Sequence, residues 1–131
     1  MKKLEIHGQI IKPGERQLIK LKVGTLTTHE PVTLRCWVIR AKKEGPTLMV
    51  TGCLHGDEIN GAEIIRRLIK SSSLKRGFKG TLIAVPIMNV PAYSNRSRYL
   101  PDRRDLNRLF PGSSKGSLGG RLAHVLTTDL L

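Results

Sequence analysis

The chain has 131 residues, enough for about one compact domain, and its 23 Lys and Arg against 10 Asp and Glu give a formal net charge of +13. Hydrophobic residues make up 39% and charged residues 25%, which is typical of a globular protein and excludes a disordered chain of low hydrophobicity. No apolar run approaches the roughly 18 residues that span a membrane, and the first residues lack the apolar stretch of a signal peptide, so we expect a cytoplasmic protein without a membrane partner.

Residues 1–45 predict antiparallel strands joined by turns. Apolar residues recur from Leu18 to Val23 and alternate with polar ones from Val32 to Val38. Such alternation indicates strands with one buried face. The turn signal Glu44-Gly45-Pro46 separates this segment from residues 46–131, where the pattern changes.

A βαβ unit is predicted next. Residues 47–52 and 81–88 are nearly continuous apolar runs, which are typical of strands covered on both faces. Between them, apolar residues from Gly61 to Lys70 recur at helical spacing. A strand, a helix and a second strand in this order favour a parallel pair of strands.

The stretch 89–120 is rich in Pro and Gly, and we expect it to be a long functional loop. An amphipathic helix is predicted from Ser117 onward. In a parallel sheet, a helix is normally followed by another strand. A domain that ends on such a helix after only two core strands is therefore expected to be incomplete. We therefore expect residues 1–131 to be a single, truncated domain.

A His-x-x-Glu pair follows the first strand of the βαβ unit. His55 and Glu58 lie between that strand and the helix, where open α/β sheets place their ligand sites. The i, i+3 spacing brings an imidazole nitrogen and a carboxylate oxygen to one side, as two ligands of one metal require. Zinc is favoured, although other transition metals fit nearly as well. Alone, the pair is also explained by a loop histidine beside a carboxylate that the helix dipole stabilises.

An arginine-rich segment lies in the long loop. Residues 96–108 hold five arginines in thirteen positions. Guanidinium groups at this density suit a carboxylate or phosphate ligand, because each can form a forked pair of hydrogen bonds.

The two segments, in this order, resemble the succinylglutamate desuccinylase/aspartoacylase family of zinc carboxypeptidase-like deacylases. The resemblance implies an α/β fold: a partial zinc-carboxypeptidase-like fold with a mostly parallel central sheet and flanking helices, preceded by the antiparallel strand-rich segment. It also implies one zinc per complete domain and hydrolysis of the amide bond of an N-acyl amino acid or a similar anionic small molecule. The matching motifs are His55-Gly56-Asp57-Glu58, Asn60-Gly61, Asn95 to Asp102, Asp105-Leu106-Asn107-Arg108 and Phe110-Pro111-Gly112.

Residue roles follow from the same resemblance. His55 and Glu58 match the family's first two zinc ligands, and Asn107 with Arg108 matches the pair that holds the substrate carboxylate. Arg98 resembles the arginine that polarises the scissile carbonyl and stabilises the oxyanion.

Two of these assignments leave alternatives within the arginine-rich segment. Arg103 or Arg104 could take the role of Arg98, because the spacing to Asp105 varies within the family. We interpret Asp105 as a structural residue of the loop rather than a catalytic acid.

The family's third metal ligand, a histidine, and its catalytic glutamate are missing from this sequence. His124 is the one histidine after His55, and no glutamate follows Glu63. We interpret His124 as a residue on a helix surface and Cys53 as a small buried residue that ends a strand, although either could complete a metal site. We therefore expect the given chain to bind metal weakly, if at all, and to be inactive.

Two other functions remain as alternatives. The first is a non-catalytic module that binds an anion through the arginine-rich segment. The second is a nucleic-acid-binding protein driven by the net charge, which we do not favour because the positive residues are spread from Lys2 to Arg121 without a recognisable nucleic-acid motif. The sequence leaves the acyl group, the amine and the oligomeric state open.

Overall fold

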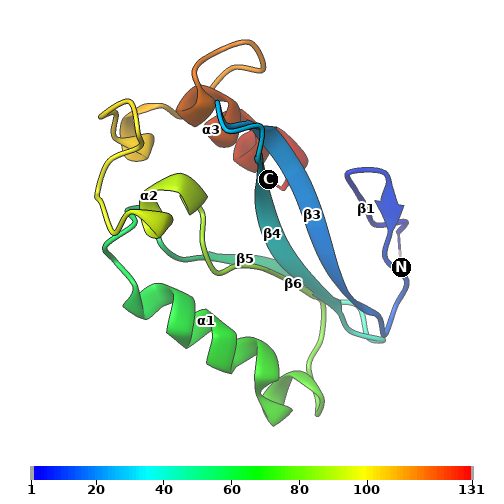
Figure 1. Ribbon diagram of the computed structural model, residues 1–131. Coiled ribbons are helices and arrows are strands. Elements are labelled where there is room, and N and C mark those ends of the chain that lie inside the picture. Colours follow the sequence, from blue (N-terminus) through cyan, green and yellow to red (C-terminus); the bar gives the residue numbers. More distant parts are fainter. Residues whose placement is uncertain (1, 131) are drawn as a thin grey trace.

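The computed structural model describes residues 2–130. A mixed four-stranded sheet lies at its centre, with α1 on one side and α3 on the other (Figure 1). No helix among these residues is long and apolar enough to cross a bilayer. The elements are β1 (Glu5–Ile6), β2 (Gln9–Ile10), β3 (Arg16–Thr25), β4 (Pro31–Arg40), β5 (Thr47–Thr51), α1 (Asn60–Lys70), η1 (Ser72–Leu74), β6 (Thr81–Val85), α2 (Val90–Ser94), η2 (Leu106–Arg108) and α3 (Leu118–Asp129).

The sheet has the strand order β3-β4-β6-β5. Strands β5 and β6 run parallel, with Thr47 opposite Thr81 and Thr51 opposite Val85, which confirms the predicted βαβ unit. The pairs β3–β4 and β4–β6 are antiparallel. The strand-rich N-terminal segment therefore joins the same sheet as the βαβ unit and makes it mixed.

The two strands of the βαβ unit differ in burial. All five residues of β6 are buried, as predicted, because this strand lies between β4 and β5. The prediction that β5 is covered on both faces is wrong: Leu48 is 59% exposed, and within residues 2–130 the strand pairs with β6 alone. A short apolar run indicates a strand but does not say whether it is central or at an edge.

Helix α1 forms because its apolar and charged residues lie on opposite faces. Ile65 and Ile69, four residues apart, are buried against Leu82 and Ala84 of β6. On the outer face, Glu63 forms ion pairs with Arg66 and Arg67, the i, i+3 and i, i+4 spacings that support a helix.

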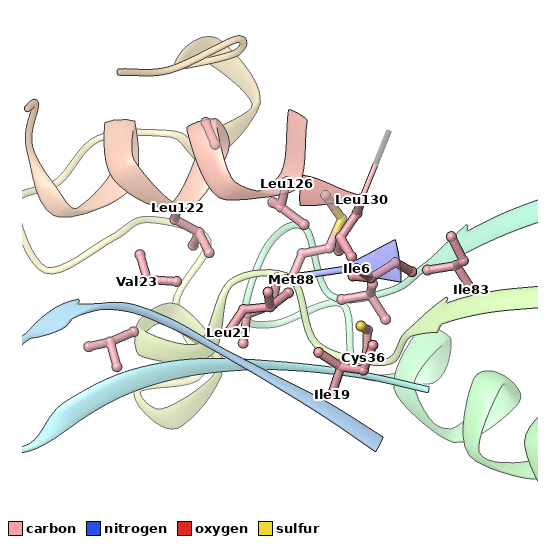
Figure 2. Packing of buried hydrophobic residues seen from close by; sticks show 14 of the residues in the cluster. Ile6, Ile19, Leu21, Val23, Cys36, Ile83, Met88, Leu122, Leu126 and Leu130 are labelled. Carbon is pink, nitrogen blue, oxygen red and sulfur yellow. The ribbon is translucent and has the colours of Figure 1, made fainter. Parts of the chain in front are cut away.

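The larger core lies on the other face of the sheet (Figure 2). Ile19 and Leu21 of β3 pack there with Ile83 of β6 beneath Leu122 and Leu126 of α3. Because successive strand residues point to opposite faces, one strand supplies both cores: Leu82 and Ala84 face α1, whereas Ile83 and Val85 face α3.

The long loop contains a short helix that the sequence analysis missed. Helix α2 begins after Asn89, whose side chain accepts a hydrogen bond from the backbone N–H of Ala92 at 3.3 Å. Pro91 lies in the first turn, where proline is tolerated because that N–H has no partner within the helix. The sequence analysis counted this proline among the Pro and Gly residues of a loop, although Asn89 followed by a proline two residues later is a helix-start signal.

The burial pattern predicts the effect of shortening two strand leucines. Leu34 on β4 is fully buried, so Leu34→Ala should lower the free energy of unfolding by about 2–5 kcal/mol through lost contacts and a residual cavity. Leu48→Ala, at an exposed position of β5, should change it by less than about 1 kcal/mol. Urea unfolding followed by circular dichroism measures both, and equal losses would contradict the observed arrangement of the sheet.

Candidate active site

The loop between β5 and α1 carries His55. Cys53 adopts a left-handed backbone conformation with φ of 51°, and the loop is held against the end of β6 by the hydrogen bonds Met88 N–H to Gly52 O at 2.9 Å and Asn89 N–H to Cys53 O at 3.0 Å. The Asn89 side chain also donates to the carbonyl oxygen of Leu54 at 3.3 Å. These bonds position His55 at the carboxyl ends of both parallel strands, the edge that the sequence predicted.

Gly56 lets α2 approach this loop at backbone distance. A Cβ atom at this position would overlap the carbonyl group of Ala92 in α2. The N–H of Gly56 donates to the carbonyl oxygen of Ser97 at 2.8 Å. Glycine is therefore required here because of the contact with α2, which the sequence analysis did not identify.

The imidazole of His55 lies between two carboxylates. Its Nδ1 is 2.8 Å from Oε1 of Glu58 and its Nε2 is 3.0 Å from Oδ1 of Asp105, while the residue is only 5% exposed. The hydrogen bond with Glu58 raises the pKa of His55; burial opposes this shift and Asp105 adds to it. In turn, the hydrogen bond from His55 lowers the pKa of Glu58.

Asp105 links three parts of the site. Its Oδ1 also accepts the backbone N–H of Asn107 at 2.9 Å, which caps η2, and its Oδ2 accepts a hydrogen bond from Nη2 of Arg98 at 3.2 Å. Although desolvation acts in the opposite direction, the hydrogen bonds from Asn107 and His55 lower the pKa of Asp105. This carboxylate shapes the loop, as the sequence analysis expected, and it also fixes the imidazole, which the sequence analysis missed.

Of the three candidate arginines, Arg98 is the one that contacts a partner of His55 within residues 2–130, through Asp105. The guanidinium of Arg104 lies 3.7 Å from Asp102 and donates weakly to Ser117. Arg103 is exposed and has a left-handed backbone with φ of 65°.

Asn107 and Arg108 lie on η2, directly after Asp105. Both are exposed, and neither side chain forms a hydrogen bond or ion pair within the described part of the chain. The structure thus brings His55, Glu58, Asp105 and Arg98 into one cluster and places Asn107 and Arg108 next to that cluster without direct contact with His55.

The cluster places two potential metal donors next to each other. Nδ1 of His55 and Oε1 of Glu58 lie side by side, whereas Asp105 contacts the opposite ring nitrogen. Among residues 2–130, no group of three or more His, Cys, Asp or Glu side chains is arranged to hold a metal ion.

The two other residues considered as metal ligands have different surroundings. His124 is half-buried on α3. Cys53 is 3% exposed, and its thiol donates to the carbonyl oxygen of Glu58 at 3.3 Å. Burial raises the pKa of this thiol, which disfavours the thiolate that a metal would require.

Comparisons with known proteins agree on one family. The model of the succinylglutamate desuccinylase/aspartoacylase catalytic domain matches residues 44–131. The N-alpha-acetyl-L-2,4-diaminobutyric acid deacetylase of Halomonas elongata is 41% identical over 90 residues, which are 67% of this chain and 26% of that protein. The chain therefore spans about a quarter of the length of this relative.

Solved structures give the same result. A crystal structure of an aspartoacylase family protein from Mesorhizobium loti matches with a TM-score of 0.83 and 31% identity, covering 99% of this chain and 41% of that one. The product-bound structure of the ectoine utilization protein EutE (DoeB) from Ruegeria pomeroyi matches with a TM-score of 0.77 and 32% identity, covering 91% of this chain and 37% of that one. The fold class predicted from the sequence is confirmed, with a mixed sheet.

The contact between Gly56 and α2 predicts a large effect of one added methyl group. Gly56→Ala should lower the free energy of unfolding by about 1–3 kcal/mol, because the loop and α2 must move apart. Gly116→Ala is the matched control, since a Cβ there would meet its nearest atom at 3.7 Å. Thermal unfolding measures both variants, and equal stability of the two would contradict the close approach of the backbones.

The carboxylate contacts predict the titration of His55 in metal-free protein. Because its pKa is raised in the folded state, the protonated ring stabilises the fold fully below the unfolded value of about 6.5, and this contribution is lost as the pH rises through the folded pKa. Glu58→Gln should lower the pKa of His55 in an NMR titration, since it removes the principal partner.

The control for this titration is Glu63→Gln. Glu63 lies on the outer face of α1 and pairs with Arg66 and Arg67, so this variant should leave the pKa of His55 unchanged. A His55 pKa that is insensitive to Glu58→Gln would show that the contact with Glu58 does not form in solution.

Proposed function

This chain belongs to the succinylglutamate desuccinylase/aspartoacylase family, and on that premise we propose that it forms part of a zinc-dependent deacylase. The substrate we propose is an N-acyl amino acid or a similar anionic small molecule, whose amide bond is hydrolysed. The observation that carries the proposal is the contact between Nδ1 of His55 and Oε1 of Glu58 at 2.8 Å, with Nε2 of His55 held by Asp105.

This donor set fits a catalytic metal in two respects. An imidazole nitrogen and a carboxylate oxygen are ordinary zinc ligands, and catalytic zinc sites use three protein ligands with one position left open. Metal-binding histidines also donate their second ring nitrogen to a carboxylate, which fixes the tautomer and the ring orientation. His55 and Glu58 supply two ligands, Asp105 supplies the outer carboxylate, and we propose that a histidine elsewhere in the whole protein supplies the third ligand.

Zinc in such a site acts as a Lewis acid that polarises a carbonyl group and lowers the pKa of water. The side chain of Arg98 is 46% exposed, and its guanidinium forms an ion pair with Asp105, which in turn contacts the imidazole of His55. We propose that its guanidinium stabilises the negative charge that develops on the carbonyl oxygen, because a charged donor at that position acts most strongly in the transition state. The position of Arg98 supports this role over Arg103 and Arg104.

We propose that Arg108 and Asn107 hold the carboxylate of the substrate. Both side chains are exposed and follow directly after Asp105 on η2, so their backbone is tied to the same residue that fixes His55. A guanidinium can bind a carboxylate through two parallel hydrogen bonds, which orients the substrate as well as binding it.

The name of the Halomonas elongata relative, an N-alpha-acetyl-L-2,4-diaminobutyric acid deacetylase, supports an acetylated amino acid as the substrate class. We also propose a cytoplasmic location, since Cys36 and Cys53 are both free and unpaired cysteines are typical of a reducing compartment.

Zinc content tests the proposed function. In the longest gene product that contains this sequence, we expect about one zinc per chain, because a complete site needs a third protein ligand. His55→Ala should abolish the zinc, and Asp105→Asn should weaken its binding by about 10–100-fold through loss of the outer carboxylate. The 131-residue chain alone should hold little zinc, since its described residues supply two ligands.

Elemental analysis of the purified proteins measures the zinc content, and His124→Ala is the matched control that should leave it unchanged. Loss of zinc on His124→Ala would show that His124 is the third ligand. An absence of zinc from the longest product would overturn the proposal in favour of an anion-binding module that uses the arginine-rich segment.

A further inference from the structure

A hollow lies at the far end of α1 from His55. It has a volume of about 470 Å³ and is formed by the start of β3, the end of β4 and the segment after α1. His55 precedes the amino end of α1, whereas this hollow adjoins its carboxyl end. An α-helix of 11 residues is about 16 Å long, so the two sites are distinct. We call this second site the basic hollow.

The lining of the basic hollow is strongly cationic. Five lysine and arginine residues line it, against a single acidic residue, Glu15. The Oε2 of Glu15 accepts hydrogen bonds from two neutral donors, the backbone N–H of Lys12 at 2.8 Å and the Gln17 side chain at 3.0 Å, so this carboxylate offsets one of the five positive charges. The five cationic residues are Arg16, Arg40, Lys42, Lys43 and Lys75.

The two arginines of the lining differ in position, and within residues 2–130 neither forms an ion pair with a carboxylate. Arg40 is only 7% exposed, and its guanidinium donates to the carbonyl oxygens of Ile11, at 2.6 Å, and Lys2. Arg16 donates to the carbonyl oxygen of Ile69 at 2.6 Å, in the last turn of α1. Carbonyl partners satisfy these N–H groups but leave the positive charge uncompensated, which is costly for the buried Arg40 and less so for Arg16, which is exposed.

The three lysines are exposed at the rim and available to a ligand. Within residues 2–130, the ammonium groups of Lys42, Lys43 and Lys75 form no ion pair or hydrogen bond. The arginines Arg66 and Arg67 on the outer face of α1, by contrast, both pair with Glu63. The three lysines of the lining therefore lack the carboxylate partners that accompany Arg66 and Arg67 on the nearby helix α1.

From these observations we propose that the basic hollow binds a small phosphorylated molecule that carries at least two phosphate charges. Its volume lies in the range of small-molecule sites, lysine is a common phosphate ligand, and half-buried Leu74 and Phe78 provide an apolar wall. A concave site of this size fits one compact ligand better than an extended strand of nucleic acid. Much of it also comes from residues 14–43, which precede the region matched by the catalytic-domain family.

Trp37 provides a direct readout of binding. It is the single tryptophan of the chain, and the guanidinium of Arg16 lies 4.5 Å from the centre of its ring. An anion that binds beside Arg16 should therefore change the tryptophan fluorescence. We expect a saturable change when pyrophosphate or ATP is titrated into the 131-residue chain at about 0.15 M salt, where weak surface pairing is screened.

Two double variants distinguish binding in the basic hollow from nonspecific attraction of an anion by the net charge of the chain. Lys43→Gln with Lys75→Gln should weaken pyrophosphate binding by at least about tenfold, because it removes two charged donors. Lys22→Gln with Lys115→Gln removes the same charge at exposed positions that do not line the hollow, and should change binding by less than twofold. All four substitutions are at exposed positions, and circular dichroism spectra identical to that of the parent confirm the fold.

Three results would overturn the proposal. The first is the absence of saturable binding of both pyrophosphate and ATP, and the second is an equal loss of affinity in the two double variants, which would indicate an effect of net charge. The third is tighter binding of a single-stranded oligonucleotide than of ATP, which would indicate a nucleic-acid surface. His55→Ala should leave pyrophosphate binding unchanged, so this test is independent of the zinc site.

Discussion

The candidate active site depends on one imidazole ring held between two carboxylates. Glu58, in the loop just before α1, binds one nitrogen of His55, and Asp105 binds the other from 50 residues further along the chain. A hydrogen bond that involves a charged partner is stronger than a neutral one. The contact with Asp105 therefore joins the arginine-rich segment to the β5–α1 loop. Because Asp105 also binds Arg98 and the backbone of Asn107, it brings these residues and Arg108 close to the site.

The surrounding backbone is arranged so that these contacts can form. Helix α2 lies directly on the His55 loop, because Gly56 has no side chain that would collide with Ala92. The fully buried Asn89 caps α2 and also binds the carbonyl oxygen of Leu54. Behind this loop, the sheet is packed between α1 and α3 (Figure 1). The ring of His55 thus rests on a framework whose polar groups are paired, which is the support that a preorganised site requires.

The excess positive charge of the chain has two different environments. In the arginine-rich segment, Arg98 and Arg104 pair with Asp105 and Asp102, so these arginines are oriented by carboxylates of the same segment. In the basic hollow, the lining cations have no carboxylate partner within the described chain; Arg16 and Arg40 contact carbonyl oxygens, and Arg16 also lies over the ring of Trp37. The first arrangement positions individual side chains, whereas the second maintains a concentrated positive field that favours an anion.

The sequence by itself determined most of the local elements and which side chains of the loop after β5 lie on one side. Hydrophobic periodicity predicted β3, β4, β6, α1 and α3, and the spacing of His55 and Glu58 predicted that their side chains lie on one side, because both features depend on residues close together in the chain. Only the tertiary structure decided that β5 lies at an edge, that Gly56 faces α2, that Asp105 reaches Nε2 of His55 and that lysines from separate segments line one hollow. These features join residues that are distant in sequence, and a local pattern does not encode which distant segments will meet.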